Sequence, residues 1–362
     1  MMMLPEIFVC RTHEFSTYEK HIPAPIFRKS FFLEKCPQKA EIFICGLGFY
    51  DLFINGKRIT KGYLAPYISN PDDVVFYDRY EVGKYLTEGE NVVGIMLGNG
   101  LQNAVGCKVW KLDEATFRSS PKLAFSYNDD TGFSFTAEEF KCSDSEILFD
   151  DLHCGVFCDK RMEKCGWENA GYDDSEWEKV MLASVPNGEK RITQAEHIVV
   201  TKELKPVSIR LAELCEYRQR EDLINLFQDI ITVETPPERT GGYLFDFGEN
   251  NAGVVRLKIR GKRGQKISLQ FAELITDGKV DYSNINFYPD GYAQRVIYTC
   301  RGGEEEVFVP PFAYFGFRYC YVNGIEEEQA KVILRFRQIT VRLQQQALCS
   351  LSRITIGRAL LL

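Results

Sequence analysis

The stretch VVRLKIRGKRGQKISLQF, residues 254–271, decides the fold class of this chain. Val255, Leu257 and Ile259 alternate with basic residues, and a second run alternates in the same way after the turn GKRG at 261–264. A period of two with apolar side chains on one side predicts strands that have one packed face and one solvated face. The stretch is therefore interpreted as two strands joined by a tight turn.

The same alternation recurs in other parts of the chain. It is found at 50–54 before the turn Asn55-Gly56, and at 317–321 before the turn Asn323-Gly324. Helical periodicity is scarce, although residues 213–227 fit one helix, and no strand–helix–strand rhythm of a parallel sheet is seen. We therefore predict an all-β fold of two consecutive antiparallel β-sandwiches followed by an irregular basic C-terminal tail.

Turns and composition divide this predicted fold into five segments. They are an N-terminal lead segment at 1–24, a first sandwich at 25–200, a linker or insertion at 201–240, a second sandwich at 241–325 and an aberrant basic tail at 326–362. The first strands of the second sandwich are expected as early as residue 205.

The overall charge argues against two classes of partner. The chain has 362 residues and a formal net charge of −7, and its pI is about 5.4. Nucleic acids and anionic membranes are usually bound by a basic face, so neither is expected as a partner. No apolar stretch approaches the roughly 20 residues that cross a bilayer, and the first residues do not resemble a signal peptide. We therefore expect a cytoplasmic protein.

The cysteine and histidine positions do not predict a metal centre. There are 12 cysteines and four histidines, and no CxxC pair recurs. His153, Cys154, Cys158 and Cys165 come closest to a metal signature, but their spacing does not match a zinc knuckle. Without a secretion signal the cysteines are expected to be reduced and mostly buried. We predict no metal and no other cofactor.

The end of the chain carries a different charge from the rest. From Gln329 to Leu362 there are six basic residues and no acidic residue, whereas the preceding residues contain all 51 acids. An acid-free stretch of this length is rare at the acid frequency of the preceding part. Two interpretations remain open, a genuine basic terminal segment or a segment read after the frame was lost near Gln329.

Two ordered series of short motifs run along the chain. The first comprises FRK at 27–29, AEIFICGLGFYDLFINGK at 40–57, LAP at 64–66, YDRYEV at 77–82, LTEGEN at 86–91, LGNG at 97–100, DKR at 159–161, GW at 166–167 and DDSEW at 173–177. It resembles the N-terminal, jelly-roll or galactose-binding-like sandwich of bacterial α-L-rhamnosidases. The second comprises YLFDFGENNAG at 243–253, FAEL at 271–274, YTCRGG at 298–303 and FGFRY at 315–319. It resembles the concanavalin-like sandwich that precedes the catalytic barrel in the same enzymes.

The resemblance implies a parent enzyme that hydrolyses terminal α-L-rhamnosides with inversion. Such hydrolysis uses a general acid and a general base whose carboxyl groups lie roughly 6.5–9.5 Å apart. In the family both groups belong to a toroidal barrel after the second sandwich, and its motif Asp-Cys-Pro-Gln-Arg-Asp-Glu-Arg is not found in this sequence. The segment CPQK at 36–39 lies before the first sandwich and lacks the acids of that motif. We therefore assign no catalytic residue.

The resemblance leaves three hypotheses for this chain. The first is an accessory portion of an α-L-rhamnosidase that is inactive alone, with a missing or separate catalytic barrel as its partner. The second is a stand-alone carbohydrate-binding module, since sandwich loops rich in aromatic residues commonly bind sugars. The third is a subunit that docks a separately encoded barrel through an exposed apolar face.

Five residues are candidates for contact with a rhamnose-containing glycan. Asp51, Asn99 and Asn103 offer oxygen ligands of the type that calcium prefers, and some family members have a calcium-assisted rhamnose site in this sandwich. Trp177 is a candidate stacking platform, and Asn250 is a candidate polar contact. Departures from the family pattern at Leu101-Gln102 and at Gly155-Val156 leave calcium binding unsupported.

Structural interpretations compete with these assignments and are favoured by the residue types. Residues 246–253 are expected to form a turn in which Gly248 and Gly253 supply unusual backbone angles. Residues 173–177 are expected to form a turn and cap, with Trp177 buried at the sandwich edge. Glu273 is interpreted as a surface carboxylate at the end of a strand.

Overall fold

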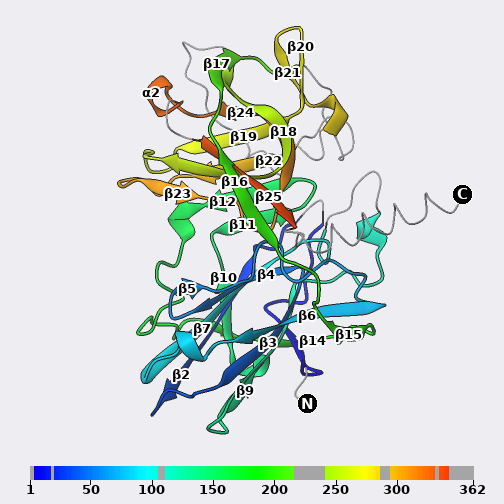
Figure 1. The fold of residues 1–362 in the computed structure, drawn as a ribbon, viewed down its shortest axis with the longest axis vertical. Helices are drawn as coiled ribbons and strands as arrows, with labels where there is room; N and C mark the ends of the chain where they lie inside the picture. Colours follow the sequence, from blue (N-terminus) through cyan, green and yellow to red (C-terminus); the bar gives the residue numbers. More distant parts are fainter. Residues whose placement is uncertain are drawn as a thin grey trace, which may run out of the picture.

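The computed structural model describes residues 4–17, 20–104, 111–215, 241–285, 294–330 and 334–341. Two bodies are stacked along the long axis of the molecule, and strands make up nearly all of the regular structure in both (Figure 1). The predicted all-β fold is therefore confirmed.

The first sandwich, the lower body in Figure 1, consists of two sheets. One sheet has the order β14 (Met181–Ala183), β1 (Phe8–Cys10), β8 (Lys122–Asp129), β3 (Ala40–Leu47), β6 (Val74–Glu81) and β15 (Glu189–Ile192), with β9 (Ser134–Thr136) paired to β8. The other has the order β13 (Glu178–Lys179), β10 (Lys141–Asp144), β2 (Pro25–Leu33), β7 (Gly89–Gly98), β4 (Phe49–Ile54) and β5 (Lys57–Arg58). The alternation predicted at 50–54 is seen in β4, where Tyr50, Leu52 and Ile54 are buried in the core of this sandwich.

The second body is built on one large sheet. Its order is β11 (Ile147–Asp151), β12 (Gly155–Asp159), β22 (Arg295–Thr299), β19 (Lys266–Ala272), β24 (Phe315–Asn323), β18 (Gly242–Ile259), β25 (Leu334–Val341) and β16 (Ile198–Leu204), with β17 (Ser208–Ala212) and β23 (Glu306–Phe308) also paired to β18. A separate hairpin pairs β20 (Leu274–Thr276) with β21 (Lys279–Asp281).

One long strand, β18, pairs with four other strands of this sheet. Residues at its start pair with β17 and with the end of β24, whereas residues 253–257 pair with β25. The register with β24 shifts between Asp246 and Asn251, and across this bulge the neighbour on the other side of β18 changes from β17 to β25. A bulge of this kind bends a strand and increases its twist.

The hairpin of β11 and β12 joins the two bodies. It precedes residue 200 in the sequence, yet β12 pairs in parallel with β22 of the second body, from Gly155 opposite Arg295 to Asp159 opposite Thr299. One apolar core continues across this seam, with Ile26 and Trp167 from the first body and Phe245 from the second. The two bodies therefore share a sheet and a core.

Sheet pairing crosses several of the expected segment limits. β1 lies in the expected lead segment but pairs with β8 and β14 of the first sandwich. β16 begins at the end of the expected first sandwich and runs into the expected linker, where it pairs with β25. β17 lies after residue 205, where the first strands of the second sandwich are expected, and it pairs with β18. The expected helix at 213–227 falls largely outside the described residues.

The expected irregular tail also differs from the structure. β25 occupies residues 334–341 and lies between β18 and β16 in the sheet. Leu334 and Phe336 are buried and alternate with Arg335 and Arg337, so this run has the same period of two as the other strands. The excess of basic residues masked that period. Residues 342–362 lie outside the described part of the chain.

Helical elements among the described residues are short. They comprise the 3-10 turns Gly83–Tyr85, Leu112–Glu114, Ala137–Glu139, Lys160–Met162 and Ser283–Ile285 and the single-turn helix α2 (Glu327–Ala330). In the part of the chain that the structure describes, no helix has the length and apolar character needed to span a membrane.

Candidate functional site

Asn99 and Asn103 form a buried cluster with Ser16. The two asparagines are 2% and 1% exposed. Asn103 Nδ2 donates to Asn99 Oδ1 (2.5 Å) and to Ser16 Oγ (3.2 Å), and the backbone N–H of Ser16 donates to Asn103 Oδ1 (2.7 Å). These predicted sugar-contacting amides are thus turned into the protein, where they tie the N-terminal segment to the turn after β7.

Asp150 on β11 completes this cluster, although no sequence motif points to it. Asp150 accepts hydrogen bonds from the backbone N–H of Asn99 (2.7 Å) and from Asn99 Nδ2 (2.8 Å). Burial raises the pKa of Asp150 to about 7, although the hydrogen bonds from Asn99 favour the ionised form. Ser16, Asn99, Asn103 and Asp150, here called the latch, fasten the first sandwich to the sheet of the second body.

Asp51 lies on β4 and is paired with Arg58 of β5. Arg58 Nη2 and Nε lie 2.6 and 2.8 Å from Asp51 Oδ1. The Asp51 carboxylate is therefore paired with a guanidinium of its own hairpin. Among the described residues, no group of three or more His, Cys, Asp or Glu side chains is placed to hold a metal ion.

A small hollow opens beside the turn that contains Leu101 and Gln102. Its lining includes the aromatic residues Tyr67, Phe76 and Phe117, and its volume is about 30 Å³. A volume of this size holds one or two water molecules, whereas ligand pockets are usually about 300–1,000 Å³. The hollow as it stands cannot enclose a sugar ring.

Trp177 is a buried core residue and not an exposed stacking platform. It is 9% exposed, and its ring centroid lies 6.2 Å from that of Trp167 and 5.9 Å from that of Tyr172. Its backbone N–H donates to the carbonyl of Asp174 (3.0 Å), whose side chain pairs with the buried Arg28. The expected turn with a buried tryptophan is confirmed, and the stacking role of Trp177 is not supported.

Asn250 lies in the bulge of β18 and is the one exposed polar amide among the five candidates. Its Nδ2 donates to Glu273 Oε1 (2.9 Å), and Asn284 Nδ2 donates to Glu273 Oε2 (2.7 Å). Asp246 of the same bulge makes two 2.9 Å hydrogen bonds with Arg318, which hold the pKa of Asp246 below its usual value. The expected turn at 246–253 is thus a bulge within one strand.

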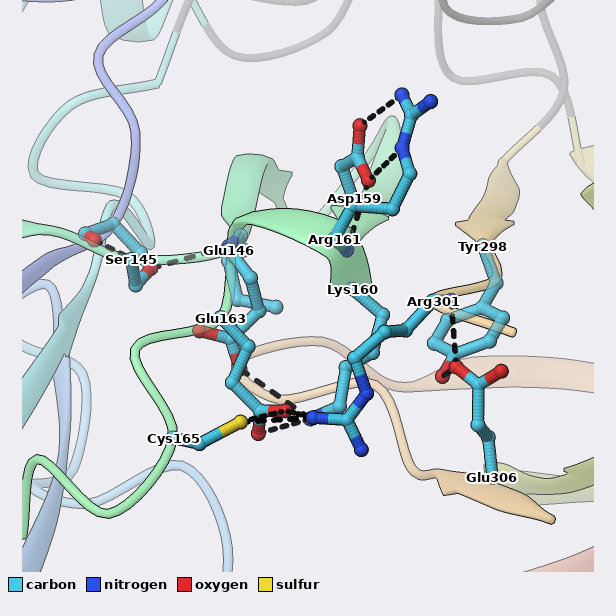
Figure 2. Close-up of polar contacts among 12 residues, drawn as sticks. Ser145, Glu146, Asp159, Lys160, Arg161, Glu163, Cys165, Tyr298, Arg301 and Glu306 are labelled. Atoms are coloured by element: carbon cyan, nitrogen blue, oxygen red, sulfur yellow. Dashed lines mark hydrogen bonds and ion pairs between the residues drawn. The ribbon is translucent and has the colours of Figure 1, made fainter. Parts of the chain in front are cut away.

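A second polar cluster joins the two bodies at the far end of the β12–β22 ladder. Figure 2 shows Glu163 and Cys165 reaching the side chain of Arg301, with Glu306 beside Tyr298. Arg301 Nη1 lies 3.1 Å from Glu163 Oε2 and 2.8 Å from Cys165 Sγ. Glu306, 5% exposed, accepts hydrogen bonds from Tyr298 Oη (2.8 Å) and from the backbone N–H of Arg301 (2.9 Å). We call these five residues the seam cluster.

The five candidate residues therefore do not form one site. Hydrogen bonds join Asn99 to Asn103, but Asp51, Trp177 and Asn250 are each engaged by other neighbours. The best organised polar groups, the latch and the seam cluster, hold the two bodies together. Sequence motifs could not reveal them, because their partners lie far apart in the chain.

Two family models match the chain. Residues 35–202 match the α-L-rhamnosidase N-terminal domain, and residues 237–342 match the bacterial α-L-rhamnosidase concanavalin-like domain. The second match includes β25, in agreement with the pairing of that strand inside the sheet.

Relatives with the same name match over most of this chain. An α-L-rhamnosidase of Formosa agariphila is 32% identical over 315 residues, which are 83% of this chain and 30% of that relative. An α-L-rhamnosidase of Streptomyces avermitilis is 26% identical over 292 residues, which are 79% of this chain and 25% of that relative. The chain thus spans about a third or less of the length of these relatives.

Solved structures agree in fold. The α-L-rhamnosidase of Dictyoglomus thermophilum is 25% identical with a TM-score of 0.74, covering 93% of this chain and 36% of that one. The Streptomyces avermitilis enzyme complexed with L-rhamnose is 24% identical with a TM-score of 0.73, covering 88% and 29%. This chain carries the N-terminal and concanavalin-like domains of bacterial α-L-rhamnosidases and belongs to that family.

Proposed function

We propose that this chain is the accessory part of an α-L-rhamnosidase and is inactive alone. In the intact enzyme it supports a catalytic domain that hydrolyses terminal α-L-rhamnosides with inversion. The observation that carries this proposal is the joining of the two family domains through one sheet and one core, in a chain that covers 30% of its Formosa relative. Domains joined in this way cannot move independently, which suits a rigid support.

The state of the acidic residues supports the same proposal. Inverting hydrolysis needs two carboxyl groups that face an open cleft with room for a sugar and a water. Glu273 accepts amides on both oxygens, Asp246 is paired with Arg318, and Asp51 is paired with Arg58. Asp150 is fully enclosed in the latch. Each of these four acids is thus engaged by neighbouring groups of the fold.

An aryl α-L-rhamnoside assay tests the proposal. The purified 362-residue chain is expected to release no aryl alcohol above the rate in buffer. Steady release by the chain, lost when it is heat-unfolded, would contradict the proposed inactivity. The Gly155→Ala variant, purified in the same way, is the control for a contaminating host enzyme. The substitution disturbs the seam of this chain but not a host enzyme, so equal release by both preparations indicates contamination.

Calorimetry tests the alternative of a carbohydrate-binding module. With the latch amides buried and the aromatic hollow too small for a sugar ring, we expect no heat of binding with millimolar L-rhamnose, with or without calcium. Saturable heat that is lost in Asn250→Ala would instead assign a sugar site to the β18 bulge, where this amide is exposed.

A further inference from the structure

The second body has an open apolar edge. β16 and β17 follow each other in the chain, and both lie at the margin of the sheet in the part of the chain that the structure describes (Figure 1). Val207, Ile209 and Leu211, here called the β17 strip, are 70%, 37% and 51% exposed. An exposed edge strand with apolar side chains is a ready surface for another polypeptide.

The β17 strip continues the core face of the sheet. Ile209 lies opposite Phe245 and Leu211 lies opposite Tyr243 in the ladder with β18. Paired residues in an antiparallel ladder point to the same face, and both partners on β18 are buried in the main core. The strip is thus an extension of the apolar face beyond the layer that covers it. Single exposed apolar residues are common on protein surfaces, whereas three in a row on the core face of a sheet indicate a surface that another polypeptide covers.

The last described residue of the chain lies beside the beginning of β16, at the same edge. β25 ends at Val341, which pairs with Ile198 at the beginning of β16. In the Formosa relative the matched 315 residues are 30% of the length, so about 700 of its residues lie outside the match. The path from Ile198 to Leu211 spans about 40 Å at the rise of a strand. A body of about 700 residues has a radius of gyration of about 26 Å and can cover that path.

We propose that the β17 strip is the docking surface for the polypeptide that follows the concanavalin-like domain in the longer α-L-rhamnosidases. This inference rests on the proposed accessory function and names the surface through which that function is carried out. The partner presents an apolar patch to Val207, Ile209 and Leu211, and backbone groups to the open edge of β17.

Hydrogen exchange on the whole chain provides the first test. The outward-facing amides of 198–212 are expected to exchange fast in the chain alone. In a chimera their exchange rate is expected to be at least about tenfold lower. The chimera joins this chain, after residue 342, to the remainder of the Formosa relative. Slow exchange of this edge in the chain alone would overturn the proposal, and so would equal exchange in chain and folded chimera. Protection that rises with the concentration of the chain alone would instead assign the edge to a second copy.

Substitutions separate docking from internal packing. Ile209→Lys with Leu211→Lys is expected to leave the melting temperature of the chain alone within about 2 °C and to lower that of the chimera. Leu182→Lys, on the edge strand β14 with 65% exposure, is the matched control and is expected to change neither. A lowered melting temperature of the chain alone would overturn the proposal, even where a chimera does not fold. An active chimera that is insensitive to the double variant refutes the docking surface but leaves the accessory function in place.

Discussion

Asp150 accepts two hydrogen bonds from Asn99, one from its backbone at 2.7 Å and one from its side chain at 2.8 Å. Asn99 directly follows β7 of the first sandwich, whereas Asp150 lies on β11 in the sheet of the second body. The two bodies are therefore fastened by a carboxylate that is enclosed by protein. An enclosed carboxylate makes this junction sensitive to pH.

The latch predicts a specific pH dependence of stability. Burial raises the pKa of Asp150 to about 7, so the folded chain keeps this proton where the unfolded chain has lost it. Its contribution therefore falls as the pH rises from about 4 to about 7 and is constant above, with a total of about 4 kcal/mol. Asp150→Asn cannot ionise, so the wild type should lose stability relative to this variant over that window. Urea unfolding at steps between about pH 4 and pH 8 measures the difference, and parallel profiles would refute the raised pKa.

Gly155 is predicted to be indispensable for the seam. It begins β12 with φ +111°, and a Cβ there would overlap the carbonyl of Arg295 on β22. We expect Gly155→Ala to cost more than about 3 kcal/mol of unfolding free energy. Gly132 has φ +89° but open space around it, so Gly132→Ala should cost only about 1–2 kcal/mol. Equal losses in urea unfolding would show that backbone angle, and not the contact with β22, sets the requirement.

Glu306 is predicted to carry much of the stability of the seam cluster. Glu306→Ala removes the acceptor for Tyr298 and for two backbone N–H groups, of Arg301 and Gly302. Each group left without a partner costs about 1–3 kcal/mol, so we expect a loss of about 3–5 kcal/mol in urea unfolding. Glu305→Ala next to it breaks only the surface pair with Lys258 and should cost less than about 1 kcal/mol. A similar small loss for both variants would contradict a structural role of Glu306.

Alanine substitutions of Trp177 and Asn250 are predicted to differ in their effect on stability. Trp177→Ala empties a position packed against Trp167 and should cost about 3–5 kcal/mol of unfolding free energy. Asn250→Ala removes one exposed hydrogen bond and should change stability by less than about 1 kcal/mol. Urea unfolding of both variants measures these losses. A loss of less than about 1 kcal/mol for Trp177→Ala would contradict its assignment as a core residue.

Much of the fold could be predicted from the sequence, because period two is a local signal. Alternation and turns alone predict the strands within 50–54, 254–271 and 317–321, and the two motif series indicate the family. The pairing of β12 with β22 could not be foreseen, since it joins residues about 140 positions apart and is marked by no motif. Leu334 and Phe336 of β25 were missed because the charge of their neighbours outweighed their spacing.

The candidate site was predicted less well than the fold. Asn99 and Asn103 were chosen for their side-chain chemistry, but residue type does not tell whether an amide faces solvent or closes a buried cluster. The acid that engages Asn99, Asp150, lies 51 residues along the chain in another sheet. For Trp177 the structural interpretation was correct, because the turn-forming residues before it have strong local preferences. The turn expected at 246–253 is a bulge within β18, and of its two glycines only Gly248 has a positive φ.

The central claim is that this chain supports α-L-rhamnoside hydrolysis without performing it. The most direct test compares the release of aryl alcohol from an aryl α-L-rhamnoside by the chain alone and by the chimera joined after residue 342 to the remainder of the Formosa relative. We predict turnover by the folded chimera and none by the chain. Turnover by the chain alone, or a folded chimera without turnover, would contradict the account.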